Sequence, residues 1–73
     1  MENTVFPKFT IGQLKPGDWI RTSDGSVGMI HDQLDQPGYR KARIEFPGDR
    51  YPVRVISLEA VVEHVTDRKM IVA

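Results

Sequence analysis

Aromatic and basic side chains occur close together in two stretches of the sequence. Trp19 stands two positions before Arg21, and Tyr39 and Tyr51 lie beside or within the basic segment 40–54. Aromatic rings stack on nucleic-acid bases or fill pockets of a protein partner, and arginine binds phosphates and carboxylates. These residue types predict a binding surface. The candidate binding residues are Trp19, Arg21, Met29, Tyr39, Lys41, Arg43, Arg50, Tyr51 and Arg54.

Side chains that could perform catalysis or bind a metal are few. The two histidines, His31 and His64, are far apart in the sequence, and there is no cysteine. Asp32 and Asp35 fall in a polar segment typical of a loop, and no phosphate-binding or nucleophile motif occurs. We therefore expect no catalytic residue, no metal site and no cofactor, and a protein without enzymatic activity.

The length and composition predict one small domain. A chain of 73 residues buries only about 60% of its unfolded surface, so self-association is an expected source of further burial. No apolar run approaches the roughly 18–20 residues of a membrane helix, and we expect no signal peptide. Because cysteine is also absent, the expected location is cytoplasmic, without a membrane partner.

Charge is balanced overall but unevenly distributed. The formal net charge is zero, which argues against a strong non-specific polyanion binder. Residues 17–36 carry one basic and four acidic side chains, whereas residues 39–54 carry five basic and two acidic ones. This separation suits contact between copies of the chain, and it also suits a solvated strand face whose charges guard an edge.

Short β-prone runs bounded by turn residues follow one another along the chain. The segment 17–30 predicts a hairpin, in which Gly25 takes the positive φ of the turn. Five strands are expected, at 18–23, 26–32, 39–46, 50–56 and 61–65, with a 3₁₀ turn over 57–60.

Alternation along these strands predicts which side chains face the core. In strand 39–46 the inward residues are Ala42, Ile44 and Phe46. In strand 50–56 we expect Val53 and Val55 inward and the intervening arginine outward. The remaining inward positions are Ile20, Gly28 and Ile30, with Gly28 marking a close backbone crossing and Pro52 an edge or a bulge.

The ends of the chain differ from its middle. Residues 1–15 are expected to form an extension that packs on the domain, with a turn or single helical turn over 10–14 capped by Thr10. Trp19 is expected to face outward unless this extension covers it. Residues 16–66 form the predicted barrel, and residues 67–73 a tail or edge strand.

The order of motifs over residues 16–65 resembles the SH3-like barrels of the KOW and Tudor type. The motifs are Pro16-Gly17-Asp18 before a strand, the Arg43–Phe46 strand, and Leu58-Glu59 before the last strand. The resemblance implies a five-stranded SH3-like barrel, a fold that serves many functions. Plasmid type II dihydrofolate reductases share the pattern. Where they have Val-Gln-Ile-Tyr, this chain has residues 50–53, Arg-Tyr-Pro-Val, which lack the amide that binds their ligands.

Three functions follow as hypotheses. The first is a small non-enzymatic module that binds another protein or a second copy of itself, as accessory or regulatory products of mobile elements do. The second is a nucleic-acid-binding domain that uses Trp19, Tyr39, Tyr51 and the basic 40–54 hairpin. The third, a tetrameric reductase, is the least favoured because its active-site motif is replaced.

Overall fold

One antiparallel sheet accounts for nearly all the regular structure in residues 6–66, the part of the chain described by the computed structural model. The fold class expected from the sequence, all-β, is confirmed. Within these residues no helix is long or apolar enough to cross a membrane. The elements are β1 (Lys8–Thr10), the 3₁₀ helix η1 (Ile11–Gln13), β2 (Trp19–Arg21), β3 (Val27–Gln36), β4 (Tyr39–Glu45), β5 (Val53–Ser57) and β6 (Val61–His64).

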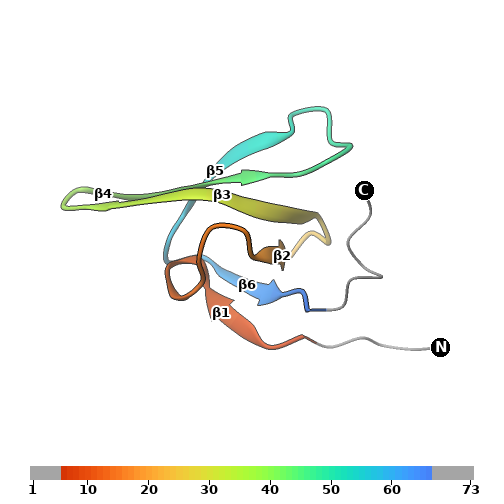
Figure 1. The fold of residues 1–73 in the computed structure, drawn as a ribbon, viewed down its shortest axis with the longest axis horizontal. Helices are drawn as coiled ribbons and strands as arrows, with labels where there is room; N and C mark the ends of the chain where they lie inside the picture. Colours follow the sequence, from red (N-terminus) through yellow and green to blue (C-terminus); the bar gives the residue numbers. More distant parts are fainter. Residues whose placement is uncertain (1–5, 67–73) are drawn as a thin grey trace.

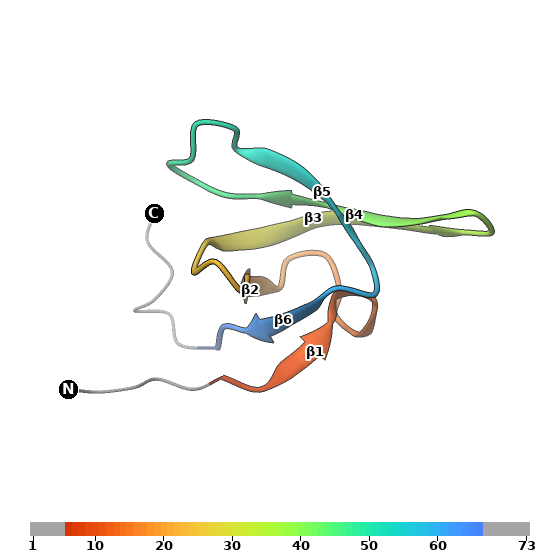
Figure 2. The ribbon, with the colours of Figure 1, turned by 180° about the vertical axis from the view of Figure 1, so that it is seen from behind.

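The order of strands across the sheet is β1-β6-β2-β3-β4-β5. Strands β2 to β5 form a meander in which each strand pairs with the next, and the β3–β4 hairpin projects beyond the rest of the sheet (Figure 1). After β5 the chain crosses back, so that β6 lies between β1 and β2 (Figure 2). The two edges of the sheet are therefore β1 and β5.

Isoleucines and one phenylalanine fill the centre of the fold. Ile20, Ile30 and Ile44 are completely buried, and Ile30 pairs with Ile44 across β3 and β4. Gly28 lies against this core, and a Cβ atom there would stand 2.7 Å from the carbonyl oxygen of Glu45 and from the Phe46 ring. The close backbone crossing predicted at Gly28 is confirmed, as are the inward positions of Ile20, Ile30, Ala42, Ile44 and Phe46.

Strand β3 contains a bulge that the alternation in the sequence does not predict. The register shifts between Ile30 and Asp32, so that His31 is the additional residue. After the bulge Gln33 takes an inward position opposite Ala42. Its side-chain amide donates hydrogen bonds to the carbonyl oxygens of Ile11 and Leu14, at 2.7 and 2.9 Å. Gln33 thus holds the η1 turn on the sheet.

Three segments of the expected fold differ in the structure. The polar segment with Asp32 and Asp35, expected to be a loop, instead continues β3 as far as Gln36. Lys8–Thr10 pair with β6 as a sixth strand, because the chain before η1 lies alongside Val61–Glu63. The 3₁₀ helix is η1, in the segment expected to form a capped helical turn, and Thr10 N–H bonds to Gln13 Oε1 at 2.9 Å. Residues 57–60 instead form a single turn, closed by a 3.1 Å bond from Ala60 N–H to the Ser57 carbonyl. The expected tail at 67–73 lies outside the described residues.

The inward assignment of Val53 and Val55 was wrong. Paired residues of neighbouring strands share a face of the sheet, and β5 pairs Arg54 with the buried Ile44. Arg54 therefore lies on the inner side, while Val53 and Val55 are 53% and 54% exposed. The apolar residues of β5 occupy both faces, so hydropathy alone cannot set its orientation.

Candidate binding surface

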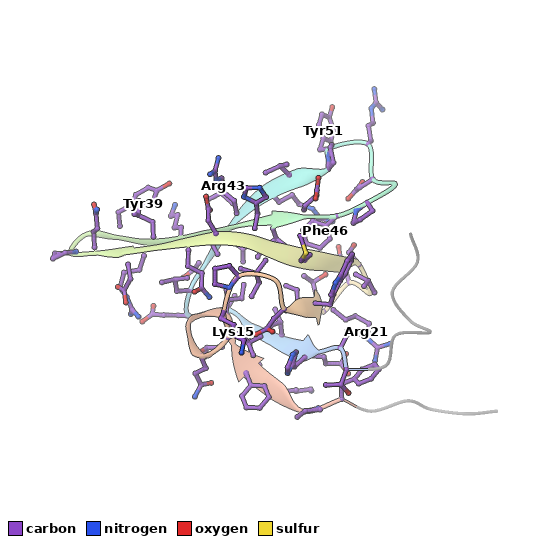
Figure 3. The ribbon with its side chains drawn as sticks, in the orientation of Figure 1. Lys15, Arg21, Tyr39, Arg43, Phe46 and Tyr51 are labelled. Carbon is purple, nitrogen blue, oxygen red and sulfur yellow. The ribbon has the colours of Figure 1, made fainter. Side chains whose placement is uncertain are left out.

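Side chains that point away from the core on β3, β4 and β5 form one continuous surface, which we call the exposed face. Its rows follow from the register: Met29 lies beside Glu45 and then Val53, and Asp32 beside Arg43 and then Val55. Figure 3 shows Tyr39 and Arg43 on the same side of the β3–β4 hairpin. The exposed face comprises Met29, Asp32, Leu34, Tyr39, Lys41, Arg43, Glu45, Val53 and Val55.

Apolar groups are prominent on the exposed face. Leu34 and Tyr39 are exposed, as are Val53 and Val55. A groove of about 330 Å³ runs between Leu34, Tyr39 and Val55. A cluster of exposed aliphatic and aromatic side chains on a small domain is typical of an interaction site.

The charges on the exposed face are largely cancelled. Arg43 donates from Nε to both carboxylate oxygens of Asp32, at 3.0 and 2.9 Å, and its Nη2 bonds to the same carboxylate. This hydrogen bonding by Arg43 lowers the pKa of Asp32 below its usual value. Lys41 instead lies over the Tyr39 ring, 5.6 Å from its centroid, and forms no ion pair with a carboxylate in residues 6–66.

Arg54, a predicted binding residue, instead forms contacts within the fold. Its guanidinium lies over the Phe46 ring, 3.9 Å from the centroid. Nη2 contacts Asp49 in the β4–β5 turn at 2.8 Å, and Nη1 lies 3.8 Å from Asp24 in the β2–β3 turn. Arg54 therefore joins two turns over the core, on the side opposite the exposed face.

Arg21, the last residue of β2, is also engaged within the fold (Figure 3). It forms two 2.9 Å hydrogen bonds with Glu63 and lies over the Phe6 ring at 5.3 Å. The bonds from Arg21 lower the pKa of Glu63. Trp19 is half-buried on β2, in the row that continues through Met29.

Arg50 and Tyr51 lie in the turn before β5. Both are exposed, with Tyr51 at 69%, and the Arg50 guanidinium is 5.8 Å from the centroid of the Tyr51 ring. Arg50 makes no ion pair with any carboxylate of residues 6–66. The basic 40–54 hairpin predicted from the sequence thus has two cations, Lys41 and Arg50, that are free of carboxylate partners in this part of the chain.

The structure brings together some of the predicted site residues and adds others. Met29, Tyr39, Lys41 and Arg43 share the exposed face, whereas Arg21 and Arg54 lie elsewhere. The additions are Leu34, Val53 and Val55. Leu34 was missed because the polar segment that contains Asp32 and Asp35 was expected to be a loop, whereas β3 continues to Gln36. The valines were missed because β5 was assigned the opposite orientation. The register of β5 against β4 is the signal that identifies them.

Comparison with known proteins finds no matching family model, no similar curated protein and no similar solved structure. Within residues 6–66, no three His, Asp or Glu side chains gather so as to hold a metal ion. The geometry of the exposed face is thus the available evidence on function.

Proposed function

We propose that this chain is a non-enzymatic protein-binding module, an accessory or regulatory protein, that contacts its partner through the exposed face. The observation that carries the proposal is the cluster of exposed apolar side chains, Leu34, Tyr39 and Val55, around a groove. Burying such side chains against a partner is favourable by about 25 cal/mol for each Å² of apolar surface. After the β2–β5 meander, β6 returns to pair with β2, and this connection supports the SH3-like architecture suggested by the sequence motifs.

The ion pairs favour a protein partner over a nucleic acid. Nucleic-acid affinity comes mainly from cations that displace counterions from phosphates. Arg40, Arg43 and Arg54 each already contact a carboxylate of the same chain. A nucleic acid would have to compete with these carboxylates, whereas an apolar partner surface could cover the Asp32–Arg43 pair while leaving it intact.

The test is capture of the partner by the wild-type chain and by two matched variants. Leu34→Asp places a carboxylate on the exposed face, and Val61→Asp places one on β6, where Val61 is similarly exposed. We expect Leu34→Asp to abolish capture of a specific protein and Val61→Asp to retain it. The captured protein should remain bound after nuclease treatment.

Capture unaffected by Leu34→Asp would contradict the proposed site. Binding of short oligonucleotides that weakens steeply with salt and is lost on Lys41→Gln would instead favour the nucleic-acid hypothesis, because phosphate contacts release counterions. Circular dichroism of each variant checks that its fold is intact.

A further inference from the structure

The outer edge of β5 has backbone groups that no residue of 6–66 pairs with. Phe46 N–H donates to the Pro52 carbonyl and Leu58 N–H to the Arg40 carbonyl, so the even-numbered residues of this strand bond to β4. In an antiparallel ladder such bonding alternates along the strand. The N–H and C=O groups of Val53 and Val55 therefore point away from β4, toward the open edge.

Three residues of β5 face the edge, of which Ser57 already uses its carbonyl to accept from Ala60 N–H. The features that usually protect an edge strand are absent from the other two, the open positions Val53 and Val55. Proline protects an edge when its missing N–H faces solvent, but Pro52 directs its backbone toward β4. Charged side chains also discourage pairing, yet the residues at the open positions are Val53 and Val55, both exposed. The opposite edge, β1, has only three residues and begins with a lysine.

We propose that the open edge of β5 pairs with β5 of a second copy of this chain, antiparallel about a two-fold axis at Arg54. This register places Val53 of one copy opposite Val55 of the other. Val53 of each copy then exchanges two N–H···O=C bonds with Val55 of the other copy. These bonds satisfy the open N–H and C=O groups of both valines in both copies. The proposal goes beyond the proposed function, since it uses the backbone edge rather than the groove.

Side chains that flank the pairing are complementary in the same register. Tyr51 of one copy falls opposite Ser57 of the other, and Ser57 is small and lies beside Lys41. The Tyr51 ring can therefore cover the Lys41 ammonium of the second copy. Arg50 falls diagonally from Glu59, whose side chain is 79% exposed and already lies 3.5 Å from Arg40 of its own chain, so that the two arginines would share this carboxylate. Arg50 has no carboxylate partner within residues 6–66, and the symmetric pairing supplies one at each end.

A second copy fits this edge better than an unrelated strand because the complementarity is internal to one sequence. Arg50 and Glu59, the two members of the charge pair, both lie within positions 50–59 of the same chain. The contact is isologous, so it closes after two copies instead of growing into a fibre. At the axis the two Arg54 side chains meet on the inner side, where each is already paired with Asp49.

Sedimentation velocity of the full chain over a hundredfold range of concentration tests the dimer. We expect the sedimenting species to shift from one chain to two as concentration rises. Arg50→Glu and Glu59→Arg should each raise the dissociation constant by about tenfold or more, because each creates two like-charge contacts. The double variant, Arg50→Glu with Glu59→Arg, should restore affinity toward that of the wild type.

Amide hydrogen exchange locates the contact independently of any substitution. Val53 and Val55 amides should be protected only at concentrations that favour the dimer. The Arg54 amide, which faces β4, serves as the internal control and should be protected at all concentrations. A chain that stays monomeric throughout, or a dimer without protection of Val53 and Val55, would overturn the proposal. Failure of the charge swap to restore pairing would reject this register.

Discussion

At the scale of single residues, several polar side chains are fixed by contacts that the sequence does not reveal. Gln33 is the main example, since its amide satisfies two carbonyl groups of the η1 turn. Asp24 is another: it accepts hydrogen bonds from the Thr22 hydroxyl and from Ser26 N–H in the β2–β3 turn. Both side chains form hydrogen bonds within the fold, so we expect their replacement to change stability.

Gln33→Ala should lower the free energy of unfolding by about 1–3 kcal/mol, because it removes the side-chain donor of the Leu14 carbonyl and leaves the Ile11 carbonyl with the Leu14 N–H alone. Urea denaturation of the variant measures this difference. Gln36→Ala is the matched control, because Gln36 is exposed on the same strand and should cost no more than about 0.5 kcal/mol. Equal stability of the two variants would show that the Gln33 amide is dispensable.

Acid should destabilise the fold through Asp24. The Thr22 hydroxyl, followed by the hydrogen bond from Ser26 N–H, lowers the pKa of Asp24 from 3.8 to about 2. A carboxyl whose pKa is lower in the folded state contributes stability above its unfolded pKa and loses it as pH falls through the folded value. The contribution is therefore present at neutral pH and disappears between pH 3.8 and about 2.

Asp24→Asn removes this titration. We expect the variant to be less stable than the wild type at neutral pH and the difference to vanish toward pH 2, as measured by urea denaturation across that range. A stability difference that does not change with pH would contradict the assignment to the Asp24 carboxylate.

At the scale of elements, β5 has the opposite orientation to the one that hydropathy suggests. Its sequence, Val-Arg-Val-Ile-Ser, offers apolar residues to both faces, and pairing with β4 decides between them. The inner position of Arg54 is stabilised by the Phe46 ring and by Asp49. An arginine can thus cover part of a core when its charge is paired and its planar group lies over an aromatic ring.

Arg54→Ala should reduce the free energy of unfolding by about 1–2 kcal/mol, since it removes the contact with Phe46 and a partly buried ion pair. Thermal unfolding measures the loss. Arg50→Ala provides the comparison, because Arg50 is exposed and forms no ion pair within residues 6–66. Unchanged stability of Arg54→Ala would return this arginine to the list of binding residues.

Some strands could be predicted from the sequence and others could not. In β4 a strict alternation placed Ala42 and Ile44 correctly, because they alternate with the charged Lys41, Arg43 and Glu45. Ile20 in β2 was also placed correctly. The bulge at His31 was not predictable, since a single additional residue leaves no hydropathy signal. Four members of the exposed face, all on β3 and β4, were predicted from the sequence. The two valines of β5 were not. Their exposure depends on strand register, a non-local property.

At the scale of the whole molecule, acidic and basic side chains lie next to each other and do not form separate patches. The acidic segment 17–36 and the basic segment 39–54 lie side by side in the sheet, where Arg43 meets Asp32 and Arg40 meets Asp35. Charge that is uneven along the sequence is therefore largely neutralised in space. Because these charges are paired, the apolar side chains are the feature that sets the exposed face apart from the rest of the surface.

The position of β6 has a consequence for biosynthesis. Lys8 pairs with Glu63, and Ile20 with His64, so the strand at the centre of one half of the sheet is contributed by residues made late. On the ribosome, β2 to β5 can pair as they emerge, whereas β1 and the free side of β2 have no partner until β6 leaves the exit tunnel. The nascent chain therefore completes its sheet in one late step, with the slow closure expected of contacts distant in sequence.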